Sequence, residues 1–196
     1  MTRFDPDQLA LLIRHRRTIK PKMMSDEPVD DAIIHEMLEN ANWAPTHGMT
    51  EPWRFQVFTG DARGRLAKFL ASTYEQLVPP ESFKQKKYDS LLANPLRAAV
   101  VIAIGMKRQE IEKISALDEI QAVACAVQNM HLTAAAHGLG AFWSTNVAAV
   151  SNQLRDLIGL GPKDRAIGLF YVGHPAAGWP ESTRQSIDEK VQWITK

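Results

Sequence analysis

The sequence predicts one α+β domain in which helices lie on both sides of a sheet, and three observations lead to this prediction. The chain has 196 residues, of which 45% are hydrophobic, so it can bury one substantial core. Helical patterns dominate, and about four strand patterns are spread among them without regular strand–helix alternation. Residues 98–104 are apolar at every position, which is typical of a strand covered on both faces.

Local signals place each element. Asp5 and Pro6 form an N-cap and a first-turn proline, and apolar residues then recur at helical spacing. Prolines and glycines mark the ends of later elements. In chain order we expect helices from Pro6 to Arg16 and from Asp30 to before Pro45, a strand at 54–59, a helix from Asp61 to before Pro79, a basic helix at 82–92, a strand at 98–104, a long alanine-rich helix at 118–137, a strand at 141–145, a helix at 151–158, a strand at 166–172 and a polar tail at 176–196.

Composition and charge argue against several classes of protein. The net charge of +1 gives no overall field that would recruit nucleic acid. The longest apolar run, 98–106, is too short to span a membrane, and the N-terminus lacks the basic-then-apolar layout of a secretory signal. A single cysteine, Cys125, cannot form an internal disulfide. We therefore expect a cytoplasmic protein that binds neither nucleic acid nor a membrane.

Common catalytic motifs are missing from the sequence. It has no Gly-x-x-x-x-Gly-Lys phosphate loop and no Gly-x-Ser-x-Gly nucleophile elbow. Its six histidines do not follow the spacing of zinc ligands, so no metal site is expected. Cys125 lies among alanines and a valine on the long helix, where a buried packing role is expected rather than a nucleophilic one.

Three segments suggest a ligand, and each also has a purely structural interpretation. Residues 16–18, Arg-Arg-Thr, can grip a phosphate or form a solvated end of a helix. The loop 43–53 holds two tryptophans and two prolines, which favours a rigid wall for a flat ligand, although Trp53 is expected to anchor the core. Residues 138–145 can present backbone N–H groups to a planar heterocycle, or form an ordinary helix end leading into a strand.

Taken together and in order, these segments resemble the FMN-dependent nitroreductase family, especially its small members, over nearly the whole chain. The family's Arg-Arg-Ser is matched by 16–18 and its Ala-Pro to Gln-Pro-Trp loop by 44–53. Its Gly-x-Gly-x-x-Trp stretch is matched by 138–143 and its Tyr-x-Gly-x-Pro strand end by 171–175. The resemblance implies a three-layer α/β/α sandwich, with an antiparallel-rich sheet of four to five strands around a long central helix.

The resemblance also implies a set of site residues. The FMN-binding residues are Arg16, Arg17, Thr18, Trp43, His47, Trp143, Ser144, Thr145 and Arg184. The nicotinamide nucleotide is expected at Ala134, Ala135, Ala136, His137 and Gly138. In small relatives the residues equivalent to Trp43 and His47 reach the cofactor of the partner subunit, which implies a homodimer with FMN at its interface. The tail 176–196 is then expected to pack on the partner.

Two loop residues depart from the family pattern. Met49 and Glu51 stand where many relatives have asparagine and glutamine, so the usual side-chain amides are missing, and His47 is the expected substitute.

The implied activity is oxidoreduction by the cofactor, without a catalytic side chain. NAD(P)H is expected to reduce FMN in a ping-pong reaction, and a nitroaromatic compound, a quinone or a similar acceptor then reoxidises it. A specialised flavoenzyme of the same fold is the alternative, either a reductive dehalogenase or a flavin-consuming enzyme, with 79–95 as a short lid. A flavin-binding protein without turnover, or an interaction module that uses the basic cluster, is a third possibility.

Overall fold

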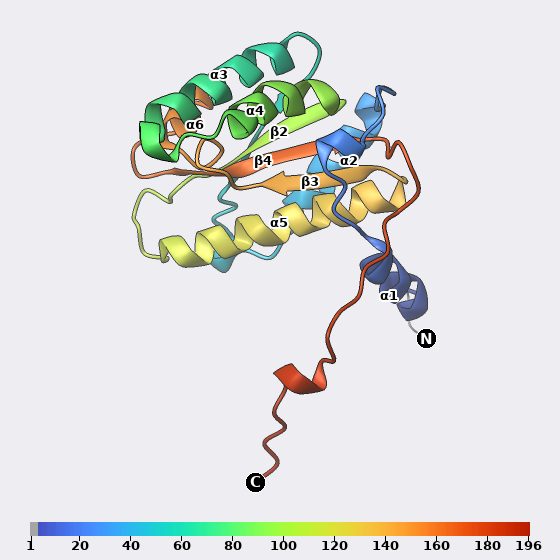
Figure 1. The fold of residues 1–196 in the computed structure, drawn as a ribbon. Coiled ribbons are helices and arrows are strands. Elements are labelled where there is room, and N and C mark those ends of the chain that lie inside the picture. Colours follow the sequence, from blue (N-terminus) through green and yellow to red (C-terminus); the bar gives the residue numbers. More distant parts are fainter. Residues whose placement is uncertain (1–3) are drawn as a thin grey trace.

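The computed structural model describes residues 4–196 and confirms the α+β class, with one sheet between two layers of helices (Figure 1). The helices are α1 (Pro6–His15), α2 (Asp31–Asn42), α3 (Ala62–Leu77), α4 (Gln85–Arg97), α5 (Ala116–Ala136) and α6 (Asn152–Leu157). The strands are β1 (Trp53–Phe58), β2 (Val100–Met106), β3 (Gly140–Ser144) and β4 (Arg165–Gly173). Short 3-10 helices η1 (Pro21–Met23), η2 (His47–Met49), η3 (Pro80–Ser82) and η4 (Asp188–Lys190) lie between or after these elements.

The strands form one antiparallel sheet in the order β1-β2-β4-β3. Every residue of β2 is buried, as its continuous apolar sequence predicts, because it has a strand on each side and a helical layer on each face. β3 lies at the edge of the sheet, and residue 18 adds a parallel bridge to it. The sheet thus brings a segment near the N-terminus beside a strand from the second half of the chain.

α5 and α2 cover one face of the sheet. Val127 and Met130 of α5 belong to the core on this side. The two helices are also tied by polar contacts: Asn40 Nδ2 donates to Thr133 Oγ1 at 3.1 Å, and Asn129 Nδ2 donates to the carbonyl oxygen of Asn40 at 2.9 Å. α5 is therefore held firmly over the sheet along its second half.

α3, α4 and α6 cover the other face, and α4 differs from its prediction. It spans Gln85–Arg97 rather than 82–92 and continues through Pro95. A proline removes one helical hydrogen bond, which favours an earlier end in the sequence. In the structure both Pro95 and Leu91 are buried, and this apolar burial compensates for the missing bond.

The prediction that Cys125 is buried is wrong, since its side chain is exposed. The buried face of α5 includes Val123, Ala126 and Val127, whereas Cys125 lies on the opposite face with the exposed Gln121. The sequence does not show which side of α5 is exposed, because alanines occur on both sides of the helix.

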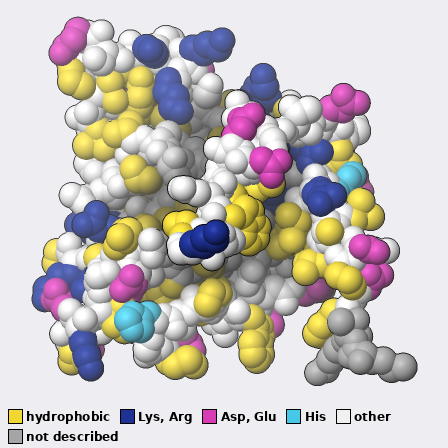
Figure 2. Space-filling view, turned by 90° about the horizontal axis from the view of Figure 1, so that it is seen from below, with side chains coloured by type: hydrophobic (Ala, Val, Ile, Leu, Met, Phe, Trp, Pro, Cys, Tyr) yellow, Lys and Arg dark blue, Asp and Glu magenta, His cyan; other side chains and the backbone are white. Residues whose placement is uncertain are grey.

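α1 and the tail 176–196 project from the layered body (Figure 1). No residue of α1 is buried, and every residue of 181–196 is exposed. Exposed apolar side chains are concentrated on these segments, including Leu9 at 55%, Trp193 at 86% and Ile194 at 81%. Figure 2 views this side and shows apolar side chains distributed between charged ones. Within residues 4–196, no helix combines the length and the apolar character needed to cross a bilayer.

Candidate functional site

A basic cavity of about 590 Å³ lies where the end of α1, the middle of α5 and the C-terminal segment meet. Its volume is within the usual range of small-molecule sites. The residues that line it are Ile13, Arg14, Arg16, Arg17, Gln128, Ser182 and Arg184. The structure thus brings together arginines from both ends of the sequence.

Within residues 4–196, the arginines of this cavity have no acidic partners. None of the ion pairs among the described residues involves Arg14, Arg16, Arg17 or Arg184. Partial burial lowers the pKa of Arg16, and the positive charges of Arg184 and Arg17 lower it further. Neighbouring cations repel one another, so an anion placed among them would be bound and would relieve the repulsion.

The two central arginines are held differently. Arg17 Nε donates to the carbonyl oxygen of Pro180 at 2.9 Å, and its Nη1 donates to the carbonyl oxygens of Arg14, His15 and Arg16 at the end of α1. Arg17 therefore closes the helix and ties it to the C-terminal segment. The Arg16 side chain donates no hydrogen bond within residues 4–196, so its guanidinium remains available to a ligand.

Residues 16–18 lie beside β3 because the backbone approaches closely there. Thr18 forms a parallel bridge with Ala141, and Ile19 N donates to the carbonyl oxygen of Ala141 at 3.0 Å. A Cβ at Gly140 would lie 2.6 Å from Ile19 Cβ, so any other residue would push the two segments apart. The glycine-flanked strand and the paired arginines thus meet on one side of the molecule.

The far end of β3 is also well ordered by hydrogen bonds. Trp143 Nε1 donates to the carbonyl oxygen of Ile167 at 3.2 Å, which holds the indole against β4. Ser144 is buried, and its Oγ accepts from Asn146 Nδ2 at 2.9 Å. Thr145 is exposed just after the strand. This end of the strand offers an indole, the exposed Thr145 and a buried Ser144 hydroxyl that accepts one hydrogen bond from Asn146.

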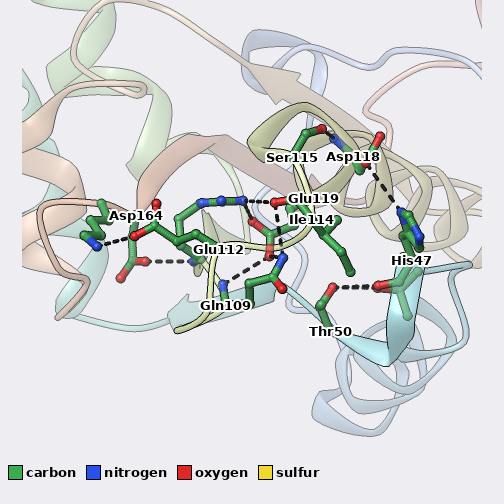
Figure 3. A network of polar contacts seen from close by, with 12 residues as sticks. His47, Thr50, Gln109, Glu112, Ile114, Ser115, Asp118, Glu119 and Asp164 are labelled. Atoms are coloured by element: carbon green, nitrogen blue, oxygen red, sulfur yellow. Dashed lines mark hydrogen bonds and ion pairs between the residues drawn. The ribbon is translucent and has the colours of Figure 1, made fainter.

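Trp43 and His47 lie apart from the basic cavity within one chain. His47 Nδ1 is 3.5 Å from Asp118 Oδ2, at the beginning of α5 (Figure 3). Gln128, which lines the cavity, is ten residues farther along the same helix, or about 15 Å at 1.5 Å per residue. Trp43 is 79% exposed. A single chain therefore does not bring His47 to the arginines.

Sequence reasoning missed a buried polar network that supports the His47 loop (Figure 3). Glu119 is 1% exposed and forms an ion pair with Arg108, whose side chain is 10% exposed. Glu119 Oε1 also accepts from Gln109 N at 3.1 Å. The neighbouring Ile114 packs so closely on Gly48 that a Cβ there would lie 2.7 Å from its Cδ1. A glutamate in the first turn of a helix normally indicates only a dipole contact, so the sequence carries no signal for this network.

The Met49 and Glu51 substitutions fall on an unusual backbone. Both residues have positive φ, at 55° and 43°, and Glu51 N donates to Thr46 Oγ1 at 3.2 Å. Met49 is 77% exposed. Neither side chain enters the basic cavity of its own chain.

The segment predicted to meet the nicotinamide nucleotide is only partly accessible. Ala134 and Ala135 are buried against the core, whereas Ala136, His137 and Gly138 are exposed at the end of α5. His137 Nε2 lies 3.0 Å from Glu36 Oε2. A ligand at this end of the helix would touch residues 136–138 only.

Comparisons with known proteins agree with this architecture. A sequence model of the Nitroreductase family matches residues 13–174. The chain is 28% identical over 189 residues to "Putative NAD(P)H nitroreductase YdjA" of Escherichia coli strain K12, covering 96% of this chain and 98% of that protein.

Solved structures give the same result. A nitroreductase-like family protein from Bacillus cereus matches with a TM-score of 0.82 at 26% identity, over 99% of this chain and 98% of that one. A "putative nitroreductase in complex with FMN" from Desulfovibrio desulfuricans matches with a TM-score of 0.72 at 27% identity, over 98% of each chain.

Some relatives carry other names. An iodotyrosine deiodinase of Hydra vulgaris is 27% identical over 202 residues, covering 91% of this chain and 70% of that protein. A 5,6-dimethylbenzimidazole synthase of Rhodospirillum rubrum is 28% identical over 206 residues, covering 98% of this chain and 93% of that protein.

Proposed function

The chain belongs to the nitroreductase family, and on this premise we propose that it is an FMN-dependent oxidoreductase that uses NAD(P)H to reduce nitroaromatic compounds, quinones or similar acceptors. The observation that carries this proposal is the basic cavity. Its arginines have no acidic partners among residues 4–196 and are suited to the phosphate of a flavin mononucleotide. Arg16 is the most available of them, whereas Arg184 Nη1 donates to Ser182 Oγ at 2.7 Å and to the carbonyl oxygen of Thr183 at 2.8 Å.

The residues of the chain fit this cofactor. Arg16, Arg17 and Arg184 surround a cavity without a counter-charge, which is the environment that a phosphate dianion requires. β3 begins beside Thr18 and Ile19, which follow the two neighbouring arginines in the chain, and Trp143 lies farther along the strand. A phosphate group at the arginines would therefore leave the rest of the nucleotide free to lie along β3.

Bound FMN would supply the redox chemistry, taking a hydride from NAD(P)H and passing two electrons to the acceptor. The task of the chain is to bind and orient. The arginines stabilise negative charge near the cofactor, because fixed cations already in place need no reorganisation during the reaction. Residues 136–138 form the accessible surface that we assign to the nicotinamide nucleotide.

We further propose that the active form is a homodimer in which Trp43 and His47 complete the site of the partner. His47 is about 15 Å along α5 from the cavity of its own chain, and Trp43 is 79% exposed. The exposed apolar residues Trp193 and Ile194 on the projecting tail also favour a protein partner. We expect each subunit to be a single domain and the dimer to be located in the cytoplasm.

The dimer is tested by sedimentation of the wild-type chain and of a variant that ends after residue 185. The wild type should sediment as a dimer, and the truncated variant should shift toward the monomer. If the wild type is a monomer and still binds FMN, the assignment of Trp43 and His47 to the site of the partner would be refuted.

The proposed activity is tested with the purified full chain saturated with FMN. Under nitrogen, NADH or NADPH should bleach the flavin absorbance, and a nitroarene or a quinone should then restore it. Steady-state rates at varied donor and acceptor should give parallel double-reciprocal lines. If the flavin stays oxidised with both donors, the protein is a flavin binder without this activity. If the wild type binds no FMN, the proposed function is wrong.

An acceptor screen on the reduced protein distinguishes a nitroreductase from a reductive dehalogenase of the same fold. Two relatives are named a deiodinase and a synthase, so halogenated phenols are included beside nitroarenes and quinones. Faster reoxidation by halogenated phenols, with release of halide, would favour a reductive dehalogenase.

A further inference from the structure

β4 carries a bulge on the side where it pairs with β2. The register between the two strands shifts after Ile104, which leaves Ile167 without a partner in β2. A bulge of this kind bends its strand and redirects the groups beside it. On its other side β4 pairs with β3, and Leu169 is the register partner of Ser144, the last residue of that strand. The bulge therefore lies next to the end of β3.

The bulge accommodates the indole of Trp143. The carbonyl oxygen of Ile167 accepts from Trp143 Nε1 at 3.2 Å. The next residue, Gly168, has a φ of 139°, a backbone conformation that residues with a side chain rarely adopt. A Cβ at Gly168 would lie 2.5 Å from Trp143 Nε1 and 2.7 Å from the carbonyl oxygen of Ser144. Position 168 therefore requires glycine both for its backbone conformation and for the space that Trp143 and Ser144 occupy.

The bulge is a local departure from an otherwise regular sheet. β1 pairs with β2, and β3 pairs with β4, without a shift of register. Bulges are frequent beside functional sites, where they change the direction of a side chain or of a backbone group. Here the redirected group is the carbonyl oxygen of Ile167, and it holds an indole that the family resemblance assigns to the FMN site. The bulge is thus connected to the candidate site through Trp143.

Trp143 lies along β3 from the arginines. Thr18, which follows Arg17, bridges Ala141 near the start of the strand. Counted from Ala141, Trp143 is about 7 Å and Thr145 about 13 Å farther along the strand, at about 3.3 Å per residue. A flavin mononucleotide with its phosphate at the arginines can span such a distance through its ribityl chain. Its ring system would then lie at the end of β3, where Trp143 is half-buried and Thr145 is exposed.

We propose that Gly168 is a positioning residue for the flavin ring system and that it acts through the indole of Trp143. This inference rests on the proposed function and deepens it, because it assigns the ring system to the end of β3. By leaving space for the indole and for the carbonyl oxygen of Ser144, Gly168 fixes the wall against which the ring system lies. A methyl group at position 168 displaces this wall and leaves the arginines near the start of β3 in place.

The test compares Gly168→Ala with the wild type. In the FMN-free protein, the indole N–H resonance of Trp143, assigned by its absence from the Trp143→Phe spectrum, should shift. With FMN bound, the visible circular dichroism of the flavin should change. The rate constant for flavin reduction by saturating NADH or NADPH should fall about 10–100-fold, because a displacement of about 1 Å can have this effect. The Kd for FMN should stay within about fivefold of the wild-type value, since the arginines are untouched.

Gly60→Ala is the matched control. Gly60 also has a positive φ, at 48°, but a Cβ there would meet nothing within 4 Å. This variant should lose some thermal stability and should keep the wild-type indole resonance, flavin circular dichroism and reduction rate. If Gly168→Ala behaves in the same way, its role is purely structural and the inference is wrong, while the proposed function stands.

The remaining outcomes are also decisive. A shifted indole resonance without any change in the bound flavin would overturn the inference, as would an unshifted resonance. If Gly168→Ala does not fold, Trp143→Phe decides, because it removes the Nε1 donor and keeps the glycine. Altered circular dichroism and slower reduction in Trp143→Phe would support the inference, and wild-type values for both would overturn it. A wild type that binds no FMN would refute the proposed function itself.

Discussion

Arg16→Leu removes a guanidinium that lines the basic cavity but donates no side-chain hydrogen bond within residues 4–196. If this group binds the phosphate, its loss removes a charge-assisted hydrogen bond that contributes about 1.5–3 kcal/mol. The Kd for FMN should then rise by a factor of about 10–150. Folding should not suffer, because partial burial and the cations Arg184 and Arg17 already disfavour the charge at this position. The FMN-free variant should be as stable as the wild type or slightly more stable.

Arg17→Leu provides the contrast. Arg17 donates to the carbonyl oxygen of Pro180 and to the last carbonyl oxygens of α1. Its removal leaves these acceptors unsatisfied or hydrated and should lower the free energy of unfolding by about 1–3 kcal/mol. The affinity for FMN should fall as well, so both quantities change in this variant and only one changes in Arg16→Leu.

FMN titration followed by flavin fluorescence gives the affinity, and urea unfolding of the FMN-free protein gives the stability. Arg65→Leu, at an exposed arginine of α3, controls for the loss of one positive charge and should alter neither result. Wild-type affinity in Arg16→Leu would refute the placement of the phosphate. Equal destabilisation by both cavity substitutions would refute the distinction between a ligand-binding and a structural arginine.

Three further outcomes are expected. Glu119→Ala leaves the nearly buried Arg108 without its ion-pair partner. Urea unfolding should show a loss of about 3–5 kcal/mol in the free energy of unfolding. A loss under about 1 kcal/mol would contradict the contribution of the ion pair. Gly140→Val places side-chain atoms against Ile19, since a Cβ at position 140 would lie 2.6 Å from Ile19 Cβ. FMN titration should therefore detect no binding to this variant. Unchanged binding would show that the bridge between residue 18 and β3 is dispensable. His131 has a folded-state pKa of about 4 against an ordinary value of 6.5, so the unfolded chain takes up its proton first. The FMN-free wild type should therefore lose up to about 3 kcal/mol as pH falls from 6.5 to 4. His131→Leu should lack this component in pH-dependent thermal melts, and an identical pH profile would contradict it.

The layered fold could be predicted from local sequence patterns, because the strongest of these patterns do not depend on tertiary contacts. The apolar run at 98–104 predicts a strand covered on both faces, and β2 is buried throughout. α4 and Cys125 show where this reasoning fails. A proline near the end of a helix and a cysteine among alanines are each resolved by packing, which a local pattern does not contain.

The candidate site was predictable only in part. The residue types at 16–18 indicated a phosphate site at Arg16 and Arg17, the resemblance added Arg184, and all three line one cavity. Arg17 differs from Arg16 because its Nε donates to the carbonyl oxygen of Pro180, which lies 163 residues away in the sequence. No local pattern reveals that contact.

The basic cavity draws on segments far apart in the sequence, which has a consequence for the retention of a ligand. Arg16 follows α1, whereas Ser182 and Arg184 follow the last strand of the sheet. Every residue of 181–196 is exposed, so this segment has little burial to hold it against the body of the protein. We therefore expect the coenzyme to be released by local opening of this segment, at a lower urea concentration than the one that unfolds the sheet.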